Sequence, residues 1–438
     1  MSILRHAAFG LAVLATPIVP VFATVPTQTT EPAAILSAAE LRADLDTWLE
    51  WTRDTHPDLA HSVEPGALEA AASALADDLP ETVTRAEAWR RLATLNPLLN
   101  DAHMGLVVPE PPALPDGTAT MTIAIEDGAL RVVEGADILP DGSVIGAVNG
   151  RTWAELLGTL RPLVRGESDR LREHIIELRL RHYLALALDG EPIDRLDYVA
   201  PDGTAGQVVI ETPIGFSTTE TGDFALSWRD SAAILSVPSF DRDREEEFAV
   251  FLADAFAEIA ARGADHLVID LRTNGGGAHD LSDRLMAYLT DRPYSAISAV
   301  TARITAENQA LIPGSTIGQI VSVPFQQTVS PPEDMENRYS GPVTIMIGPA
   351  TYSQAIVFAA TARDHEVARL TGQPTAGPAN QTGQVQSHRL PHSGFTVRAP
   401  LYVLYRASGD PSRAPLMPDI VIPADADDPI GAVLAVPE

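Results

Sequence analysis

Apolar residues recur every three to four positions along residues 36–107, a spacing typical of amphipathic helices. The positions on one face of the first such segment are Leu41, Leu45, Trp48, Leu49 and Thr52. Residues 67–79 are rich in alanine, and Thr84 followed by Glu87 resembles a capping box that would begin a helix over 86–99. The pattern predicts an N-terminal helical domain over residues 36–107.

A proline cluster at residues 109–115 separates this region from one in which short apolar segments alternate with Asp-Gly and Asn-Gly turns. The predicted strands are 121–125, 130–133 and 144–148. Residues 172–188 predict a helix. We therefore expect a small α+β middle domain over residues 116–220, similar to a reduced PDZ domain.

From residue 224 onward, strands alternate with helices. Apolar runs predict buried strands at 233–237, 266–271 and 343–347. Amphipathic spacing predicts helices over 245–261 and over 353–362. Because helical crossovers connect parallel strands, this alternation indicates a third domain over residues 224–438 with an α/β fold and a largely parallel sheet.

The N-terminal residues have the pattern of a secretory signal. Arg5 and His6 precede an apolar run over residues 7–22, and small residues then precede a cleavage point after Ala23. The run is short and interrupted by proline, which disfavours a membrane span, although an uncleaved anchor is the alternative. We expect a signal peptide over residues 1–23, a secreted protein in a bacterial periplasm, and no stable membrane insertion after cleavage.

Composition narrows the chemistry. Lys+Arg is 30 and Asp+Glu is 59, a net charge of −29, which argues against nucleic acid as a partner. Cysteine is absent, and all 30 basic side chains are arginine, so a thiolate nucleophile and a Ser–Lys dyad are excluded. A general base at neutral pH must therefore be one of the 11 histidines or a carboxylate with a raised pKa.

Residues 270–277 read Asp-Leu-Arg-Thr-Asn-Gly-Gly-Gly at the end of a predicted strand. Consecutive glycines allow the backbone to approach a ligand closely, and their N–H groups can form an anion cradle before a helix. The alternative is a flexible turn. A phosphate-binding loop is disfavoured because neither of its usual glycine patterns is present.

A second segment places Ser353 at the predicted start of a helix, where the helix dipole would stabilise an oxyanion. Such a serine can equally be an N-cap. In a third segment, Asn-Asp-Ala-His-Met-Gly-Leu, His103 follows the predicted helical domain and is either a catalytic base or a structural residue. His388 and His392 lack a third ligand at metal-binding spacing, so no metal and no cofactor is expected.

Taken together, these segments resemble the tail-specific (C-terminal processing) protease family of serine peptidases, in its histidine-using, tricorn-core-like and nisin-resistance-like branch. Five family patterns occur in the expected order along the chain: D-x-H comes first, followed by D-L-R-x-N-x-G-G, T-x-S-x-A, G-x-x-T-x-G and P-D. The matching residues are Asp270, Leu271, Arg272, Asn274, Gly276, Gly277, Thr351, Ser353, Ala355, Gly372, Thr375, Gly377, Pro418, Asp419, Asp101 and His103. The chain departs from the family pattern at Met104, where a threonine is usual, and at Ile356, where a glutamate is common.

The resemblance implies a ClpP/crotonase-like β-α core and a serine-type endopeptidase that uses a Ser/His rather than a Ser/Lys mechanism. The implied catalytic residues are Ser353 and His103, with an oxyanion hole formed by Gly276, Gly277 and Gln354. The substrate would be a peptide or protein, cleaved in an extended segment or at its C-terminus. A carboxylate should orient His103, and Asp101 is adjacent, but the sequence leaves its identity open. A catalytically inactive binding protein and an esterase on the same scaffold are the alternatives.

Overall fold

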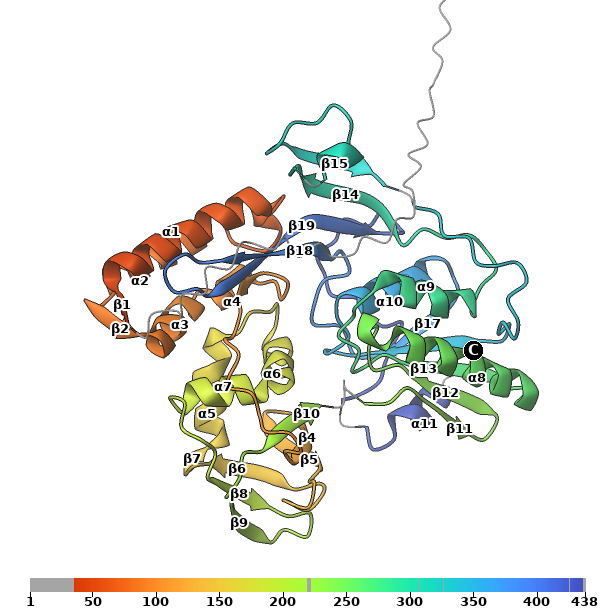
Figure 1. Cartoon of the computed structure of the whole chain (residues 1–438). Coiled ribbons are helices and arrows are strands. Elements are labelled where there is room, and N and C mark those ends of the chain that lie inside the picture. The colour runs from red at the N-terminus through yellow and green to blue at the C-terminus, as the bar shows by residue number, and fades with distance from the viewer. Residues whose placement is uncertain (1–34, 219–221, 307, 326, 425, 436–438) are drawn as a thin grey trace, which may run out of the picture.

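The computed structural model describes residues 35–218, 222–306, 308–325, 327–424 and 426–435. The predicted signal peptide lies outside these residues. Figure 1 shows an N-terminal helical region, a middle region with its own sheet, and a C-terminal region built on two further sheets. The mixed α/β architecture with a helical N-terminal region confirms the predicted fold class. Among the described residues, no helix is both long enough and apolar enough to cross a membrane.

The N-terminal region is helical, as predicted. Its elements are β1 (Ile35–Ser37), α1 (Ala38–Thr55), η1 (Leu59–His61), α2 (Ala67–Asp77), β2 (Thr82–Thr84), α3 (Arg85–Ala93) and α4 (Asn96–Leu99). The side chain of Thr84 caps α3 by accepting from the N–H of Glu87, whose carboxylate pairs with Arg91 at 2.9 Å. The prediction of one helix over 86–99 is wrong, because Pro97 has no N–H to donate to the preceding turn and the helix divides there.

The middle region is a seven-stranded sheet in the order β10–β4–β5–β6–β8–β9, with β7 beside β6. Its strands are β4 (Thr120–Glu126), β5 (Ala129–Glu134), β6 (Val144–Val148), β7 (Arg151–Thr152), β8 (Arg195–Val199), β9 (Ala205–Val209) and β10 (Gly215–Thr218). Its helices are α5 (Trp153–Leu160), η2 (Arg161–Leu163), α6 (Asp169–Leu178) and α7 (Leu180–Ala187). The single helix predicted over 172–188 is therefore wrong, because Arg179, at φ −126° and ψ 31°, leaves helical geometry.

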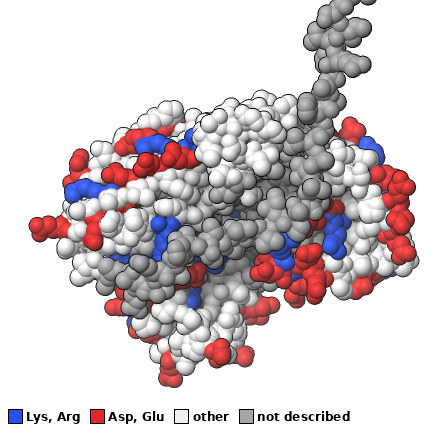
Figure 2. All heavy atoms as spheres, turned by 45° about the horizontal axis from the view of Figure 1, so that its top comes forward, with Lys and Arg blue, Asp and Glu red and all other residues white. Residues whose placement is uncertain are grey.

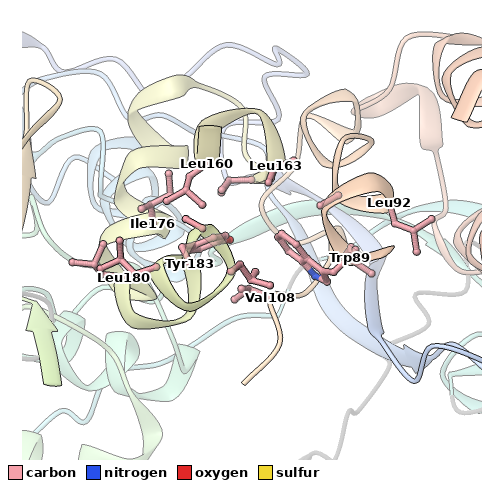
Figure 3. Close-up of a cluster of buried hydrophobic side chains, with 14 of the residues drawn as sticks. Trp89, Leu92, Val108, Leu160, Leu163, Ile176, Leu180 and Tyr183 are labelled. Atoms are coloured by element: carbon pink, nitrogen blue, oxygen red, sulfur yellow. The ribbon is translucent and has the colours of Figure 1, made fainter. Parts of the chain in front are cut away.

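Apolar side chains join the N-terminal and middle regions into one core (Figure 3). Trp89 of α3 packs edge-on against Tyr183 of α7, with ring centroids 6.3 Å apart. The indole N–H of Trp89 donates to the Val107 carbonyl at 2.8 Å, so the ring is both buried and satisfied. The two regions share this buried interface and are held in one relative position.

The C-terminal region contains a six-stranded sheet in the order β11–β12–β13–β16–β17–β20. Its strands are β11 (Ala225–Arg229), β12 (Ala232–Ser236), β13 (His266–Asp270), β16 (Val343–Ile347), β17 (Arg369–Gly372) and β20 (Ile420–Val421). Its helices are η4 (Arg242–Arg244), α8 (Glu245–Arg262), α9 (His279–Ala287), α10 (Gln354–Asp364) and α11 (Pro429–Leu434). All neighbouring strands are parallel except β11 and β12, and α8, α9 and α10 cover the face opposite α11 (Figure 1). This arrangement confirms the predicted largely parallel sheet.

A second, antiparallel sheet links the C-terminal region to the N-terminal one. Its strands are β14 (Ile297–Arg303), β15 (Ile320–Pro324), β18 (Thr382–Arg389), β19 (Thr396–Arg406) and the short β3 (Gly105–Leu106), with η5 (Gln309–Leu311) between β14 and β15. Gly105 of β3 pairs with Arg398 of β19. The segment that follows α4 is thereby fixed against the C-terminal region.

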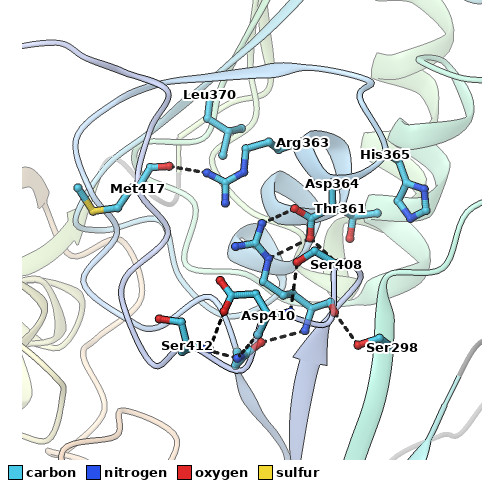
Figure 4. A network of polar contacts seen from close by, with 12 residues as sticks. Ser298, Thr361, Arg363, Asp364, His365, Leu370, Ser408, Asp410, Ser412 and Met417 are labelled. Atoms are coloured by element: carbon cyan, nitrogen blue, oxygen red, sulfur yellow. Dashed lines mark hydrogen bonds and ion pairs between the residues drawn. The ribbon is translucent and has the colours of Figure 1, made fainter.

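The C-terminal end of α10 is anchored to the end of β19 (Figure 4). The guanidinium group of Arg406 donates to both carboxylate oxygens of Asp364, with Nε to Oδ2 at 2.9 Å. The backbone N–H of Ser408 donates to the same oxygen at 3.0 Å. Because this carboxylate and guanidinium are largely buried and bidentate, they hold α10 in a defined position relative to the antiparallel sheet.

Candidate active site

Ser353 occupies the turn between β16 and α10, at the carboxyl end of the parallel sheet. Its backbone has φ 49° and ψ −123°, a region that residues with a side chain rarely adopt and that costs about 1–3 kcal/mol. The Ser353 hydroxyl makes no capping hydrogen bond to α10. The strained turn therefore presents the side chain away from the helix, as happens where a nucleophile is exposed on a sharp strand-to-helix turn.

The residues on either side of Ser353 secure this turn. The Thr351 hydroxyl donates to the Leu271 carbonyl at 2.7 Å and accepts from the N–H of Gly348 at 2.9 Å. The N–H of Tyr352 donates to the Asn274 carbonyl at 3.0 Å. The loop after β16 is thus hydrogen-bonded to the loop after β13.

The loop after β13 is shaped by its own polar residues. Arg272 donates to both carboxylate oxygens of Asp270, at 2.9 and 2.6 Å. Asn274 donates to the Val237 carbonyl at 3.0 Å and accepts from the N–H of Gly276 at 2.8 Å. These contacts explain why the segment needs an aspartate, an arginine and an asparagine at these positions.

The two glycines that follow are required by close approach. Gly276 has φ 103°, and a Cβ there would lie 2.8 Å from both the Gln354 nitrogen and Ser353 Cβ. Gly277 has φ 135°, and a Cβ there would lie 2.1 Å from the Phe240 carbonyl oxygen. Of the three residues predicted for the oxyanion hole, Gly276 and Gln354 thus lie beside Ser353, whereas Gly277 follows Gly276 in the chain and packs against Phe240. Within the described part of the chain the N–H of Gly276 donates to Asn274, whereas those of Gly277 and Gln354 have no acceptor.

His103 lies on the short turn that connects α4 to β3. Asn100, at φ 48°, ends α4, and the Asp101 carboxylate accepts from the N–H of His103 at 2.7 Å. Gly105 then begins β3 at φ 122°, where a Cβ would lie 2.6 Å from Asn96 Oδ1. His103 therefore sits on a fixed turn between a helix and a strand.

The structure brings His103 and Ser353 together. His103 Nε2 lies 3.1 Å from Ser353 Oγ, although the two residues are 250 positions apart in the chain. His103 Nδ1 lies 2.9 Å from the Thr382 hydroxyl at the start of β18, and 3.6 Å from Asp101 Oδ1. The hydrogen-bond partner of Nδ1 is thus the Thr382 hydroxyl, while Asp101 bonds the His103 backbone.

Burial sets the charge of His103, whose side chain is only 14% exposed. Burial lowers the pKa of His103, Asp101 opposes this shift, and Arg165 and Arg398 add to it. The imidazole is consequently neutral at pH 7. If Nδ1–H donates to Thr382, then Nε2 carries the lone pair that faces the Ser353 hydroxyl.

Sequence reasoning missed three residues near the pair: Thr382, Tyr352 and Glu167. The Tyr352 hydroxyl donates to Glu167 Oε1 at 2.8 Å and lies 3.5 Å from His103 Nδ1. Burial, followed by the charge of Asp101, raises the pKa of Glu167 to about 8. Tyr352 could have been noticed inside the T-x-S segment, but nothing local marks Thr382 or Glu167.

The two departures from the family pattern are core residues. Met104 is fully buried in the cluster that joins the N-terminal and middle regions, and Ile356 is fully buried beneath the six-stranded sheet. His388 stacks on Trp51 with centroids 5.3 Å apart. The described residues hold no group of three or more His, Asp or Glu side chains placed to bind a metal ion.

A serine at a strained helix start, facing a neutral histidine, is the arrangement of a hydrolase that attacks through a serine side chain. Residues 231–422 match the family model described as Peptidase family S41. The chain therefore carries a domain of peptidase family S41, the family of the tail-specific serine peptidases, and peptides or proteins are the implied substrates.

Solved structures of CPAF share the fold. Mature CPAF is similar at a TM-score of 0.61, with 16% identity over 89% of this chain and 94% of that chain. A CPAF mutant gives a TM-score of 0.63 with the same identity and coverage. The photosystem II D1 C-terminal processing protease gives 0.45, with 14% identity over 88% of this chain and 93% of that chain. The comparison with curated protein sequences gives no match.

Proposed function

We propose that this chain is an exported serine endopeptidase that works by a Ser/His mechanism. The observation that carries the proposal is the 3.1 Å approach of His103 Nε2 to Ser353 Oγ. A Ser–Lys dyad has no lysine to use, since the chain contains none. The strained backbone of Ser353 and the neutral state of His103 support the same roles.

In this mechanism Ser353 Oγ attacks the carbonyl carbon of a peptide bond while its proton passes to His103 Nε2. His103 Nδ1–H remains bonded to the Thr382 hydroxyl, which orients the ring. The imidazolium then gives its proton to the leaving amine, and water hydrolyses the acyl-enzyme by the reverse sequence of proton transfers. The Thr382 hydroxyl takes the orienting role for which the sequence suggested a carboxylate.

The N–H groups of Gly277 and Gln354 are the proposed oxyanion donors. Neither N–H has an acceptor among the described residues. Because Gly276 has no side chain, no Cβ fills the space beside Ser353 and the Gln354 nitrogen. The Gly276 N–H donates to Asn274 Oδ1 and is therefore not a proposed oxyanion donor. A glycine is needed at this position because the backbone approaches Ser353 closely. Loss of one oxyanion donor typically lowers the rate about 10²–10³-fold.

An extended peptide would bind by adding a strand to β18. This strand is an edge of the antiparallel sheet within the described residues, and it begins at Thr382, in contact with His103. An edge strand offers unpaired N–H and C=O groups that an extended substrate can use. The scissile bond would then lie beside the Ser353–His103 pair.

We propose export to a bacterial periplasm from the signal pattern over residues 1–23. Expression of the full chain in a bacterium, followed by fractionation and N-terminal sequencing, checks this. A mature N-terminus at Thr24 in the periplasmic fraction supports it. A full-length cytoplasmic product would overturn it.

The test of activity compares residues 24–438 with Ser353→Ala and His103→Gln on a library of unstructured peptides, from pH 5 to 9, with products identified by mass spectrometry. Ser73→Ala, at an exposed position of α2, is the matched control. Cleavage by the parent and the control that disappears in both site variants establishes the Ser/His peptidase. Folded protein that binds peptides without cleaving them would indicate a binding protein, and cleavage of esters alone would indicate an esterase.

A further inference from the structure

Glu167 is a carboxyl group in an unusual place for this chain. Figure 2 shows acidic side chains exposed to solvent over one face of the molecule. By contrast, the Oε2 atom of Glu167 is buried and has no hydrogen-bond partner within the described residues. Its other oxygen, Oε1, accepts from the Tyr352 hydroxyl at 2.8 Å. Burial of a partly unsatisfied carboxyl group costs free energy, which favours a functional reason for its position beside the proposed site.

The loop that carries Glu167 is fixed against the segment of the proposed base. This loop connects η2 to α6 in the middle region. Before Glu167, the Arg165 Nε donates to the carbonyl of Ala102, the residue that precedes the histidine, at 2.7 Å. Within the loop, the Gly166 carbonyl accepts from Arg172 at 2.8 Å. These contacts hold the Glu167 backbone in a defined position relative to the histidine.

The Tyr352 ring is enclosed between the histidine and a glycine loop. Its centroid lies 5.0 Å from that of the His103 ring, and the tyrosine is only 8% exposed. A Cβ at Gly377 would lie 2.6 Å from Tyr352 Cε2 and 3.5 Å from Glu167 Oε1. The N–H of Tyr352 donates to the Asn274 carbonyl at 3.0 Å, which fixes the backbone. The tyrosine hydroxyl therefore stays within reach of both Glu167 and His103.

The single proton of the Tyr352 hydroxyl bears on the tautomer of His103. This hydroxyl lies 2.8 Å from Glu167 Oε1 and 3.5 Å from His103 Nδ1. Because the proton is donated to Glu167, the tyrosine oxygen presents lone pairs to Nδ1, which favours a hydrogen on Nδ1. The Thr382 hydroxyl, 2.9 Å from Nδ1, cannot make this choice alone, since a hydroxyl both donates and accepts. A hydrogen on Nδ1 leaves Nε2 with its lone pair, 3.1 Å from Ser353 Oγ.

Loss of the Glu167 acceptor would favour the opposite tautomer. A buried hydroxyl without an acceptor is costly, so the Tyr352 O–H would turn to the lone pair of His103 Nδ1, the other group within hydrogen-bond distance of it among the described residues. The hydrogen of the neutral ring would then lie on Nε2 and face Ser353. Such a ring cannot take the serine proton, and the wrong tautomer lowers kcat by up to about 10⁴-fold.

We propose that Glu167 is a positioning residue that keeps His103 in the Nδ1–H tautomer by accepting the hydrogen bond of the Tyr352 hydroxyl. Through this contact the middle region acts on the proposed base without reaching the reacting atoms. The inference rests on the proposed function, because the tautomer matters for catalysis only if His103 is the base. The tautomer itself can be measured without turnover.

The experiment reads the tautomer by ¹H–¹⁵N NMR correlation of the imidazole rings in protein labelled with ¹⁵N-histidine. The signals of His103 are those that disappear in His103→Gln. The spectra are recorded at pH 9, because burial raises the pKa of Glu167 to about 8 and the ionised group can then only accept. Burial also raises the pKa of Tyr352 well above its usual range, so its hydroxyl keeps its proton at this pH.

The variants separate the hydrogen bond from packing. Glu167→Met removes the acceptor, whereas Glu167→Gln keeps an oxygen that can accept. Tyr352→Phe, combined with Glu167→Met, removes the competing donor as well. Asp283→Leu is the matched control, because Asp283 accepts from the buried Tyr294 hydroxyl at 2.7 Å in another pair of a tyrosine and a carboxyl group. If Glu167→Met fails to fold, Glu167→Leu gives the same comparison.

The expected parent spectrum has the His103 hydrogen on Nδ1. Glu167→Met should shift the ratio of the two tautomers about tenfold toward Nε2–H and lower kcat by a similar factor with little change in KM. Glu167→Gln and Asp283→Leu should keep the parent tautomer. Adding Tyr352→Phe to Glu167→Met should return the ratio toward that of the parent, a rescue that a loss of packing alone would not show.

Retention of the Nδ1–H tautomer in Glu167→Met would overturn the inference. A tautomer shift in Glu167→Met that Tyr352→Phe does not reverse would also overturn it, because the hydroxyl would then not be the cause. Peptide cleavage by the parent is measured separately. A tautomer that depends on Glu167 in a protein without cleavage would refute the peptidase and leave the positioning role standing. Cleavage by a protein whose tautomer is independent of Glu167 would do the reverse.

Discussion

The hydroxyl of Tyr352 donates a hydrogen bond to Glu167 Oε1 at 2.8 Å. This bond joins the residue before the proposed nucleophile to a loop of the middle region. The Tyr352 ring also lies 5.0 Å from the His103 ring, centroid to centroid. The middle region therefore contacts the site directly, and its position bears on the geometry of His103.

Glu167 should make stability depend on pH. Its pKa is raised from 4.5 to about 8 in the folded chain, so the folded state binds more protons than the unfolded state between these values. The contribution of Glu167 to the free energy of unfolding is then fully present below about pH 4.5 and is lost as the pH rises through about 8. Thermal unfolding at pH 5 and pH 8 should show a larger fall for the parent than for Glu167→Gln, which cannot ionise. An equal fall in both proteins would contradict this assignment.

The acid limb of kcat/KM should lie below pH 6.5. Burial lowers the pKa of His103, and the base form required for attack is therefore present at lower pH than for an exposed histidine. Asp101 opposes the shift, so Asp101→Asn, which keeps an acceptor for the His103 N–H, should move the limb lower still. A pH–rate profile of both proteins measures this. A limb above pH 6.5, or an upward shift in Asp101→Asn, would refute it.

Thr382→Val should lower kcat about 10- to 100-fold. Valine matches threonine in shape but removes the acceptor for His103 Nδ1, whose bond gains strength when the ring becomes charged. Thr382→Ser keeps the hydroxyl and should retain most of the activity. Steady-state kinetics with a single peptide separates kcat from KM. Comparable losses in both variants would show that the methyl group matters instead.

Gly276→Ala should abolish most activity. The new Cβ would lie 2.8 Å from Ser353 Cβ and from the Gln354 nitrogen, so the serine turn must shift. Gly66→Ala is the matched control, because Gly66 has φ 79° but a Cβ there meets nothing within 4 Å. The control should lose about 1–2 kcal/mol of stability through backbone strain and keep its activity. Denaturant unfolding and a peptide assay on both variants test this, and equal activities would argue against the close approach.

Much of the fold follows from local patterns in the chain. Apolar periodicity located α1, α8, β13 and β16, because burial of one helix face or of a whole strand requires that spacing whatever the surroundings. The motif residues Asp270, Asn274 and Thr351 also act locally, since the side chain of each accepts a hydrogen bond from a backbone N–H two or three residues away. Such motifs also allowed Ser353 and His103 to be identified as candidate catalytic residues from the sequence.

Other features were decided by tertiary structure. The break between α6 and α7 at Arg179 is one of them, because no proline or glycine marks it and the apolar periodicity continues across it. The contacts of His103 with Thr382 and of Tyr352 with Glu167 span 279 and 185 positions. The chain by itself determined which segments form helices, strands and reactive turns, because these depend on neighbouring residues. Only the folded arrangement decided which distant polar groups meet, because a hydrogen bond between them exists only after the hydrophobic cores have fixed the three regions together.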